Sequence, residues 1–326
     1  MEANQDLVPN VDESLKLLQN LPTMELCERK KVILRLAKNP SPFVRQRALN
    51  IGSVLLSDEE LVDFLRNESD DVVRNTGLEI FKIKGQRCFS LMVSLLKEED
   101  KDVALQALLI LDSMSTPRAV EPILELIRKT DDLNLLQAAI IAIGRIGDER
   151  VIPELVKFLY SEPWLQIAAI SALGEIRSAK AVPYLRQFLN SSPLNSIAME
   201  ALARIGGEDV YQCLEKNWIS KRDSTDNEIM LELLVYVAEG LEEVNSAIPE
   251  MAKKLLVLFE DEDSKICSLS ARLAIALNFE TLFSKAIKIL ERSENLPERM
   301  PICYLKRKNF LKGFLSSKEP LFSWGI

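Results

Sequence analysis

The stretch AAIIAIGRIGDERVIPELVKFLYSEPWLQIAAISALGEIRSAKAVPYLRQFL, residues 138–189, contains nearly the same pattern twice. The segment Ala142-Ile143-Gly144-Arg145-Ile146 returns thirty residues later as Ala172-Leu173-Gly174-Glu175-Ile176. Likewise, Val151-Ile152-Pro153-Glu154-Leu155 returns as Ala181-Val182-Pro183-Tyr184-Leu185. Self-similarity at a period of about 30 residues is typical of a solenoid, in which each repeat buries its apolar face against the next one. The stretch therefore predicts a repeat architecture.

The same pattern extends over residues 41–218, which we interpret as six regular repeats. Each repeat is expected to contain a first helix of about ten residues, a polar turn and a second helix of about fourteen. The turns are rich in Asp, Asn, Ser and Pro, which suit helix N-termini. Aligning the central residue of each second helix gives Ile51, Ile80, Leu111, Ala142, Ala172 and Ala201. The intervals differ by only one or two residues, which loops absorb.

The flanking segments lack this regular period. Residues 1–40 predict a disordered start, followed by capping helices at 11–20 and 23–38, the second with Thr23 as N-cap. Residues 219–299 predict longer, divergent helical repeats in a strongly acidic region, with helices near 228–240, 247–259, 264–278 and 281–291. Residues 300–326 form a basic and aromatic tail, which predicts either weak contact with a membrane surface or an acidic partner, or a C-terminal cap helix.

The composition excludes several classes of protein. Of the 326 residues, 47% are hydrophobic but only 6% are aromatic, which suits closely packed helices. The net charge of −8 argues against a nucleic-acid partner. The five cysteines form no C-x-x-C pair, which predicts free thiols in a reducing compartment. Because no signal peptide and no apolar run of about 20 residues is visible, we expect a cytoplasmic protein without a transmembrane segment.

The sequence contains no histidine. Histidine-based acid–base catalysis, Cys-His or Ser-His nucleophile pairs and His-containing metal sites are therefore impossible. The abundant acids lie mainly in turns, where helix capping explains them. We accordingly predict no catalytic residues, no metal ligands, no cofactor and no enzymatic activity. Arg45 and Arg74 have two interpretations, either anion binding or hydrogen bonds that join each repeat to neighbouring turn groups.

The repeat residues resemble a known family. The pattern in residues 140–159 and 170–189, with the pairs Val44-Arg45 and Val73-Arg74, is similar to the short HEAT repeats first described in phycobilin-attachment lyases. This resemblance implies an all-α fold, a right-handed α-solenoid of stacked antiparallel helix pairs (a HEAT/armadillo-like superhelix). It also implies that the second helices line a concave face, on which such repeats bind a protein partner.

Polar residues that interrupt the apolar second helices are the candidate partner-binding residues. They are Gln137, Arg145, Gln166, Glu175, Glu200 and Arg204, together with Trp164 in the first turn of its helix. For the polar residues, the alternative is a plain solvated stripe. For Trp164, the alternative to an exposed docking position is a place in the core.

The sequence leaves three functional hypotheses open. The first is a non-enzymatic HEAT-repeat scaffold or adaptor. The repeat subtype suggests the second, a bilin lyase-like or chaperone-like helper protein. A third resembles the HEAT-like alkylpurine DNA glycosylases, which bind DNA in a basic groove. Because residues 1–220 contain 26 basic against 32 acidic residues, a basic groove is not expected. We therefore favour the scaffold.

Overall fold

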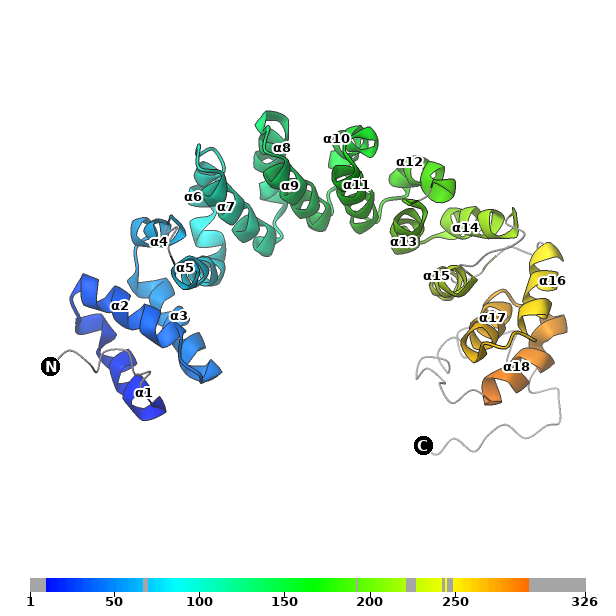
Figure 1. The fold of residues 1–326 in the computed structure, drawn as a ribbon, viewed down its shortest axis with the longest axis horizontal. Coiled ribbons are helices and arrows are strands. Elements are labelled where there is room, and N and C mark those ends of the chain that lie inside the picture. Colours follow the sequence, from blue (N-terminus) through cyan, green and yellow to red (C-terminus); the bar gives the residue numbers. More distant parts are fainter. Residues whose placement is uncertain are drawn as a thin grey trace. The chain divides into compact units, whose positions relative to one another are not determined.

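The computed structural model describes residues 10–66, 70–191, 193–220, 227–241, 244 and 249–292. These residues form helices and turns and contain no strand, so the predicted all-α class is confirmed. The chain consists of two compact units, residues 1–172 and 173–326 (Figure 1). The predicted disordered start (1–9) and the basic tail (300–326) lie outside the described residues.

Unit 1 is a stack of antiparallel helix pairs, as the repeat pattern predicts. Its helices are α1 (Val11–Asn20), α2 (Leu26–Ala37), α3 (Pro42–Leu55), α4 (Asp58–Leu65), α5 (Asp71–Lys84), α6 (Phe89–Leu95), α7 (Lys101–Met114), α8 (Val120–Lys129), α9 (Leu133–Ile146), α10 (Ile152–Val156) and α11 (Pro163–Glu175), the last of which continues beyond residue 172. The first helices α4, α6, α8 and α10 form one row, and the second helices α5, α7, α9 and α11 form the other (Figure 1).

Neighbouring second helices pack against each other through small residues. A Cβ atom added to Gly144 of α9 would lie 2.6 Å from both Cα and Cβ of Ala172 in α11. Such a distance leaves no room for a side chain, so glycine is required by this close approach. Ala139 and Ala142 on the same helix are also buried. The repeated Ala-Ile/Leu-Gly segment therefore sets the spacing between repeats.

Turn residues begin the second helices as expected. The side chain of Asp100 accepts hydrogen bonds from the backbone N–H groups of Asp102 and Val103, and Asp132 accepts one from Leu135. Asp70 plays the same part at the start of α5. Each acid satisfies amides that have no partner within the helix. The acidic turns thus cap helices.

The prediction that Thr23 caps the second helix is wrong. Residues Leu21–Thr23 form a 3₁₀ turn, and α2 begins only at Leu26. The Thr23 hydroxyl donates to the carbonyl of Asn20 at 2.8 Å, facing back toward α1. Because Pro22 fits the start of a short turn, the chain changes direction before the helix can begin.

Most first helices are shorter than the ten residues expected: α4 has eight residues and α6 has seven, and two others are shorter still. Helix α10 covers Ile152–Val156 and then tightens into a 3₁₀ turn at Lys157–Tyr160. In unit 2, α12 (Val182–Leu185) continues in the same way into Arg186–Asn190. Tight i→i+3 bonds are common where a helix ends, because they satisfy the last carbonyl groups. The segments keep nearly their predicted length but not regular α geometry.

Unit 2 continues the helical arrangement with longer helices. After α12 come α13 (Asn195–Ile205), α14 (Glu208–Ser220), α15 (Asn227–Glu239), α16 (Pro249–Leu258), α17 (Ser264–Ala276) and α18 (Phe283–Arg292). Helices α13, α15 and α17 pack in sequence, and α16 lies against α14 and α17. In the described part of the chain, no helix is both long and apolar enough to cross a membrane.

Trp218 fixes the centre of unit 2. Its side chain is fully buried, and its indole N–H donates to Oδ1 of Asn227 at 3.1 Å. The Lys254 ammonium lies 4.3 Å from the indole ring and donates to the Trp218 carbonyl at 2.7 Å. Burial lowers the pKa of Lys254, and the ring and carbonyl compensate its charge. One aromatic side chain thereby joins α14, α15 and α16.

Candidate partner-binding surface

Exposed large apolar residues of unit 1 gather on its second helices. Seven such residues, each between 38% and 73% exposed, belong to α3, α5, α7, α9 and α11: Phe43, Val54, Val72, Leu109, Leu133, Trp164 and Ile167. Within the described residues, α4, α6 and α8 have none. Outside the second helices, unit 1 exposes Val11 of α1, Leu26 of α2 and Tyr160 in the turn after α10. The apolar exposure therefore favours one face, which we call the second-helix face.

Apolar residues of helix α11 are spread over most of its circumference. Leu165, Ala168 and Ala169 are buried, as expected for a helix in a stack. Trp164 and Ile167, three residues apart and hence on one side of the helix, are 42% and 41% exposed. A helix that is hydrophobic on every side normally has all sides covered. The exposed side of α11 is the clearest candidate for coverage by another molecule.

Trp164, Gln137 and Gln166 lie in the N-terminal halves of the second helices. Trp164 is exposed, so the alternative of a core position does not apply to it. Gln137 is half-buried and is the fifth residue of α9, as Ile167 is of α11, so both share the exposed side. Gln166 is only two residues from Trp164, and therefore faces a different direction. It occupies the helix position that Arg45 holds in α3.

Of the other four candidates, three form ion pairs between successive second helices, and Glu200 pairs within its own helix. Arg145 of α9 pairs with Asp112 of α7 at 2.6 Å. Arg204 of α13 lies 3.3 Å from Glu175 of α11 and 3.9 Å from Glu200 on its own helix. These charges are neither isolated nor a merely solvated stripe.

A third ion pair of this kind joins two later second helices. Arg272 of α17 makes a bidentate contact with Glu239 of α15, at 2.9 and 3.0 Å. We call the pairs Asp112–Arg145, Glu175–Arg204 and Glu239–Arg272 the ion-pair ladder. Sequence reasoning missed Asp112, although an acid near the end of one second helix and an arginine near the end of the next could have indicated the pair.

Arg45 and Arg74 are engaged by turn groups. Arg45 Nη1 donates to the carbonyl oxygens of Asn39 at 2.7 Å and Pro40 at 2.8 Å. Arg74 pairs with Asp71 in the first turn of its own helix. Their contacts support the structural interpretation over anion binding.

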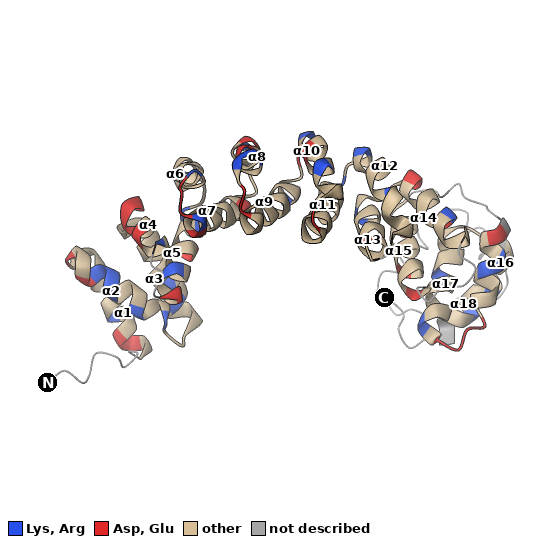
Figure 2. Cartoon of the chain, turned by 45° about the horizontal axis from the view of Figure 1, so that its top comes forward, with Lys and Arg blue, Asp and Glu red and all other residues tan. Residues whose placement is uncertain are grey.

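Charges are unevenly distributed between the helices. In Figure 2, α9 and α11 are largely free of charged residues, whereas α4 and α8 carry several. Basic residues from α17 and α18 offset the acids of unit 2: Lys265 lies 2.5 Å from Glu228 and 2.7 Å from Glu232, and Lys285 lies 2.9 Å from Glu260. Among the second helices of unit 1, α9 and α11 thus carry one charged residue each, Arg145 and Glu175.

The described residues contain no group of three or more Cys, Asp or Glu placed to hold a metal ion. Cys88 is buried, and burial raises the pKa of its thiol to about 11. A thiol with so high a pKa is a poor nucleophile. Cys27 is exposed, and Cys213 and Cys267 are partly buried; all four are free thiols.

Comparison with known proteins identifies the repeats. A family model described as HEAT repeats matches residues 90–164 and 160–234. No curated protein matches the sequence. A chain from a homology model of the full-length AP-3 complex in an intermediate open conformation is similar, with a TM-score of 0.50 and 14% identity. The match covers 94% of this chain but only 64% of that one, and at this identity it shows the fold alone.

The fold and the family model agree on the same segment. Residues 90–234 include the duplicated stretch, the glycine contact between α9 and α11, and the exposed Trp164. The match does not confirm the phycobilin-lyase-like subtype. Residues 90–234 therefore consist of HEAT repeats.

Proposed function

We propose that this HEAT-repeat protein is a non-enzymatic scaffold that binds a protein partner on its second-helix face, the face expected to be concave in such solenoids. The exposed apolar side of α11 carries the proposal, because Trp164 and Ile167 remain accessible on a helix whose other large apolar residues are buried. The absence of histidine from the whole chain supports the non-enzymatic half of the proposal.

The exposed side chains are sufficient to anchor a partner. Covering the accessible part of Trp164 would remove roughly 80 Å² from water, worth about 2 kcal/mol. Tryptophan is among the residues most enriched at the energetic centres of interfaces. Ile167 and Leu109 extend the apolar area, and Gln137 supplies a half-buried amide for hydrogen bonding. The surface therefore combines apolar anchors with a polar neighbour.

The ion pair Asp112–Arg145 of unit 1 is expected to form part of the rim of this surface. Arg145 and Glu175 are the only charged residues of α9 and α11, and each lies in the last turn of its helix. Rim charges influence the rate and orientation of association more than affinity. Of the seven residues selected from sequence, we therefore assign Trp164 and Gln137 to the centre of the interface.

Affinity capture with the intact chain tests the proposal, with captured proteins identified by mass spectrometry. The variant Leu109→Lys/Ile167→Lys places two charges on the second-helix face. The control is Tyr160→Lys, which places a charge at an even more exposed apolar residue on the first-helix row. We expect the double variant to lose partners that the control retains. If wild type and double variant capture the same partners equally well, the proposed face is wrong.

A further inference from the structure

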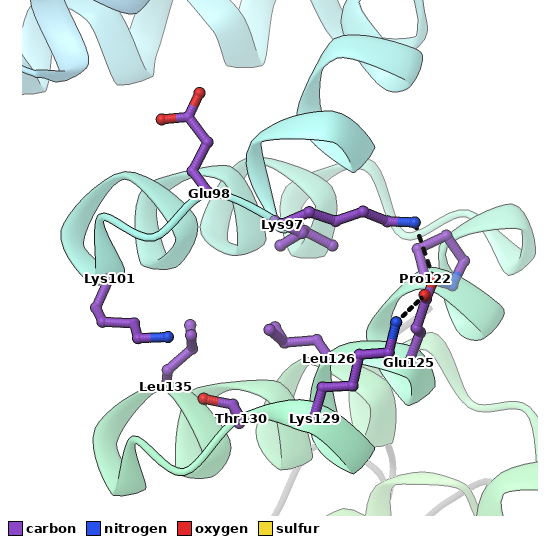
Figure 3. Close-up of a pocket in the computed structure, with 10 residues that line it drawn as sticks. Lys97, Glu98, Lys101, Pro122, Glu125, Leu126, Lys129, Thr130 and Leu135 are labelled. Atoms are coloured by element: carbon purple, nitrogen blue, oxygen red, sulfur yellow. Dashed lines mark hydrogen bonds and ion pairs between the residues drawn. The ribbon is translucent and has the colours of Figure 1, made fainter.

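A hollow of about 240 Å³ opens at the turn edge of unit 1 (Figure 3). It lies between the turn that joins α6 to α7 and the turn that joins α8 to α9. Leu96, Leu126 and Leu135, all at most 9% exposed, form its apolar part. Lys101, the first residue of α7, and Lys129, the last residue of α8, line it from opposite sides (Figure 3). The hollow thus combines an apolar part with lysines at its rim.

Both carboxylates that line the cleft already have basic partners. Glu125 accepts from Lys129 at 2.6 Å and from Lys97 at 3.1 Å, and these two contacts lower the pKa of Glu125. Glu98 points away from the cleft toward Arg66, at 2.7 Å (Figure 3). Two lysines thus share one carboxylate, which leaves them able to accept a second anion.

Lys101 adds a positive charge that does not stabilise its own helix. No carboxylate lies within 4.0 Å of its ammonium group among the residues that the structure describes. It is the first residue of α7, at the positive end of the helix dipole, where a cation is disfavoured by about 0.3–1 kcal/mol. An anion in the cleft would relieve this repulsion.

The lining therefore matches a ligand with two adjoining parts. A side chain of the leucine or isoleucine type would contact Leu126 and Leu135, and neighbouring carboxylates would reach Lys101 on one side and Lys129 on the other. Within a protein, an apolar residue next to Asp or Glu in an extended segment has this chemistry. The opposite charge pattern, a basic segment, would meet three lysines and be repelled.

We propose that the cleft between α6–α7 and α8–α9 binds an acidic peptide segment of a protein partner, with an apolar side chain on the leucines and carboxylates at Lys101 and Lys129. The site lies at the turns, and its lining shares no residue with the second-helix face. It stands whether or not the second-helix face binds a partner.

Fluorescence anisotropy with a labelled short peptide of alternating Leu and Asp tests this on the full chain. A Leu/Asn peptide of the same pattern removes the charge while keeping the size. We expect the Asp peptide to bind, Lys101→Ala to weaken its binding about fivefold, and added salt to weaken it further. Lys157→Ala removes the same charge from α10's exposed end, outside the cleft, and should leave binding unchanged.

A gain of affinity provides a second readout that loss of folding cannot mimic. Glu125→Gln releases Lys97 and Lys129 from their carboxylate, and should tighten the Asp peptide about threefold. Equal binding of the Asp and Asn peptides would overturn the proposal, as would equal weakening by Lys157→Ala and Lys101→Ala. A peptide with phosphoserine in place of Asp completes the comparison. If it alone bound, the cleft would be a phosphate site, and the proposed carboxylate recognition would be wrong.

Discussion

Replacing Gly144 by alanine separates the packing argument from intrinsic helix propensity. In an isolated helix, this change should stabilise the helical state by about 1 kcal/mol, because alanine favours the helix more than glycine does. In the structure, however, the new Cβ would lie 2.6 Å from Cα and Cβ of Ala172 and 3.1 Å from its carbonyl oxygen. Two of these three atoms belong to the backbone and cannot rotate away, so α9 and α11 would have to move apart.

The expected cost follows from that movement. Overpacking a close-packed interior costs about 1–3 kcal/mol, and a rigid backbone neighbour places Gly144→Ala at the upper end. After the gain in propensity is subtracted, we expect a net loss of about 2 kcal/mol in the free energy of unfolding. Gly52→Ala is the matched control. Its Cβ would lie 3.0 Å from the end of the Ile80 side chain, which can move, so this variant should be nearly neutral.

Urea denaturation followed by circular dichroism and by tryptophan fluorescence measures the difference. The midpoint for Gly144→Ala should fall well below that of wild type, whereas Gly52→Ala should stay close to it. If Gly144→Ala were as stable as wild type, the close approach of α9 and α11 could not be what requires glycine there. The repeat spacing would then need another explanation.

Three further predictions concern side chains with different degrees of burial. Trp218→Ala should cost about 3–5 kcal/mol, because Trp218 is fully buried, whereas Trp164→Ala should cost about 1 kcal/mol; urea midpoints would distinguish them. Arg145→Ala breaks an exposed ion pair and should cost less than about 1 kcal/mol, with the difference reduced in high salt. Hydrogen bonds from Lys129 and Lys97 lower the pKa of Glu125 from its ordinary value of 4.5, so its stabilising effect is present above pH 4.5 and is lost as pH falls through the lowered pKa. The stability difference between wild type and Glu125→Gln, measured at neutral and at strongly acidic pH, should therefore disappear in acid.

The repeat architecture could be predicted because it follows from local rules. The period, the glycine and alanine positions and the acidic turns each express one requirement of packing or capping, and each is visible within a few residues. Gly144 illustrates this, since its segment recurs at Gly174, where an added Cβ would also lie 2.7 Å from the backbone of the next helix, at Ala201. The prediction that Thr23 caps a helix was wrong because a 3₁₀ turn that contains Pro22 lies where the helix was expected to begin.

The binding surface was only partly predictable. Ile167 and Leu109 were not selected, because apolar residues on second helices are expected in the core, and periodicity does not reveal which apolar side remains uncovered. The available signal was that the apolar residues of α11 are spread over most of its circumference, which exceeds what two neighbours can bury. Conversely, Arg145 attracted attention as a polar interruption, but its partner Asp112 lies 33 residues away, beyond local patterns.

The contact between α9 and α11 influences both the packing of the repeats and the binding of a partner. Gly144 sets how closely the two helices approach, and thereby how far the exposed side of α11, with Trp164, lies from Gln137 on α9. The affinity of a partner that contacts both helices should depend on this distance, because side chains held on rigid helices tolerate little displacement. Gly144→Ala should therefore weaken such a partner even in conditions where the variant is fully folded, whereas Gly52→Ala should not. The glycine that the repeat requires for stacking would then also determine the geometry of the interface.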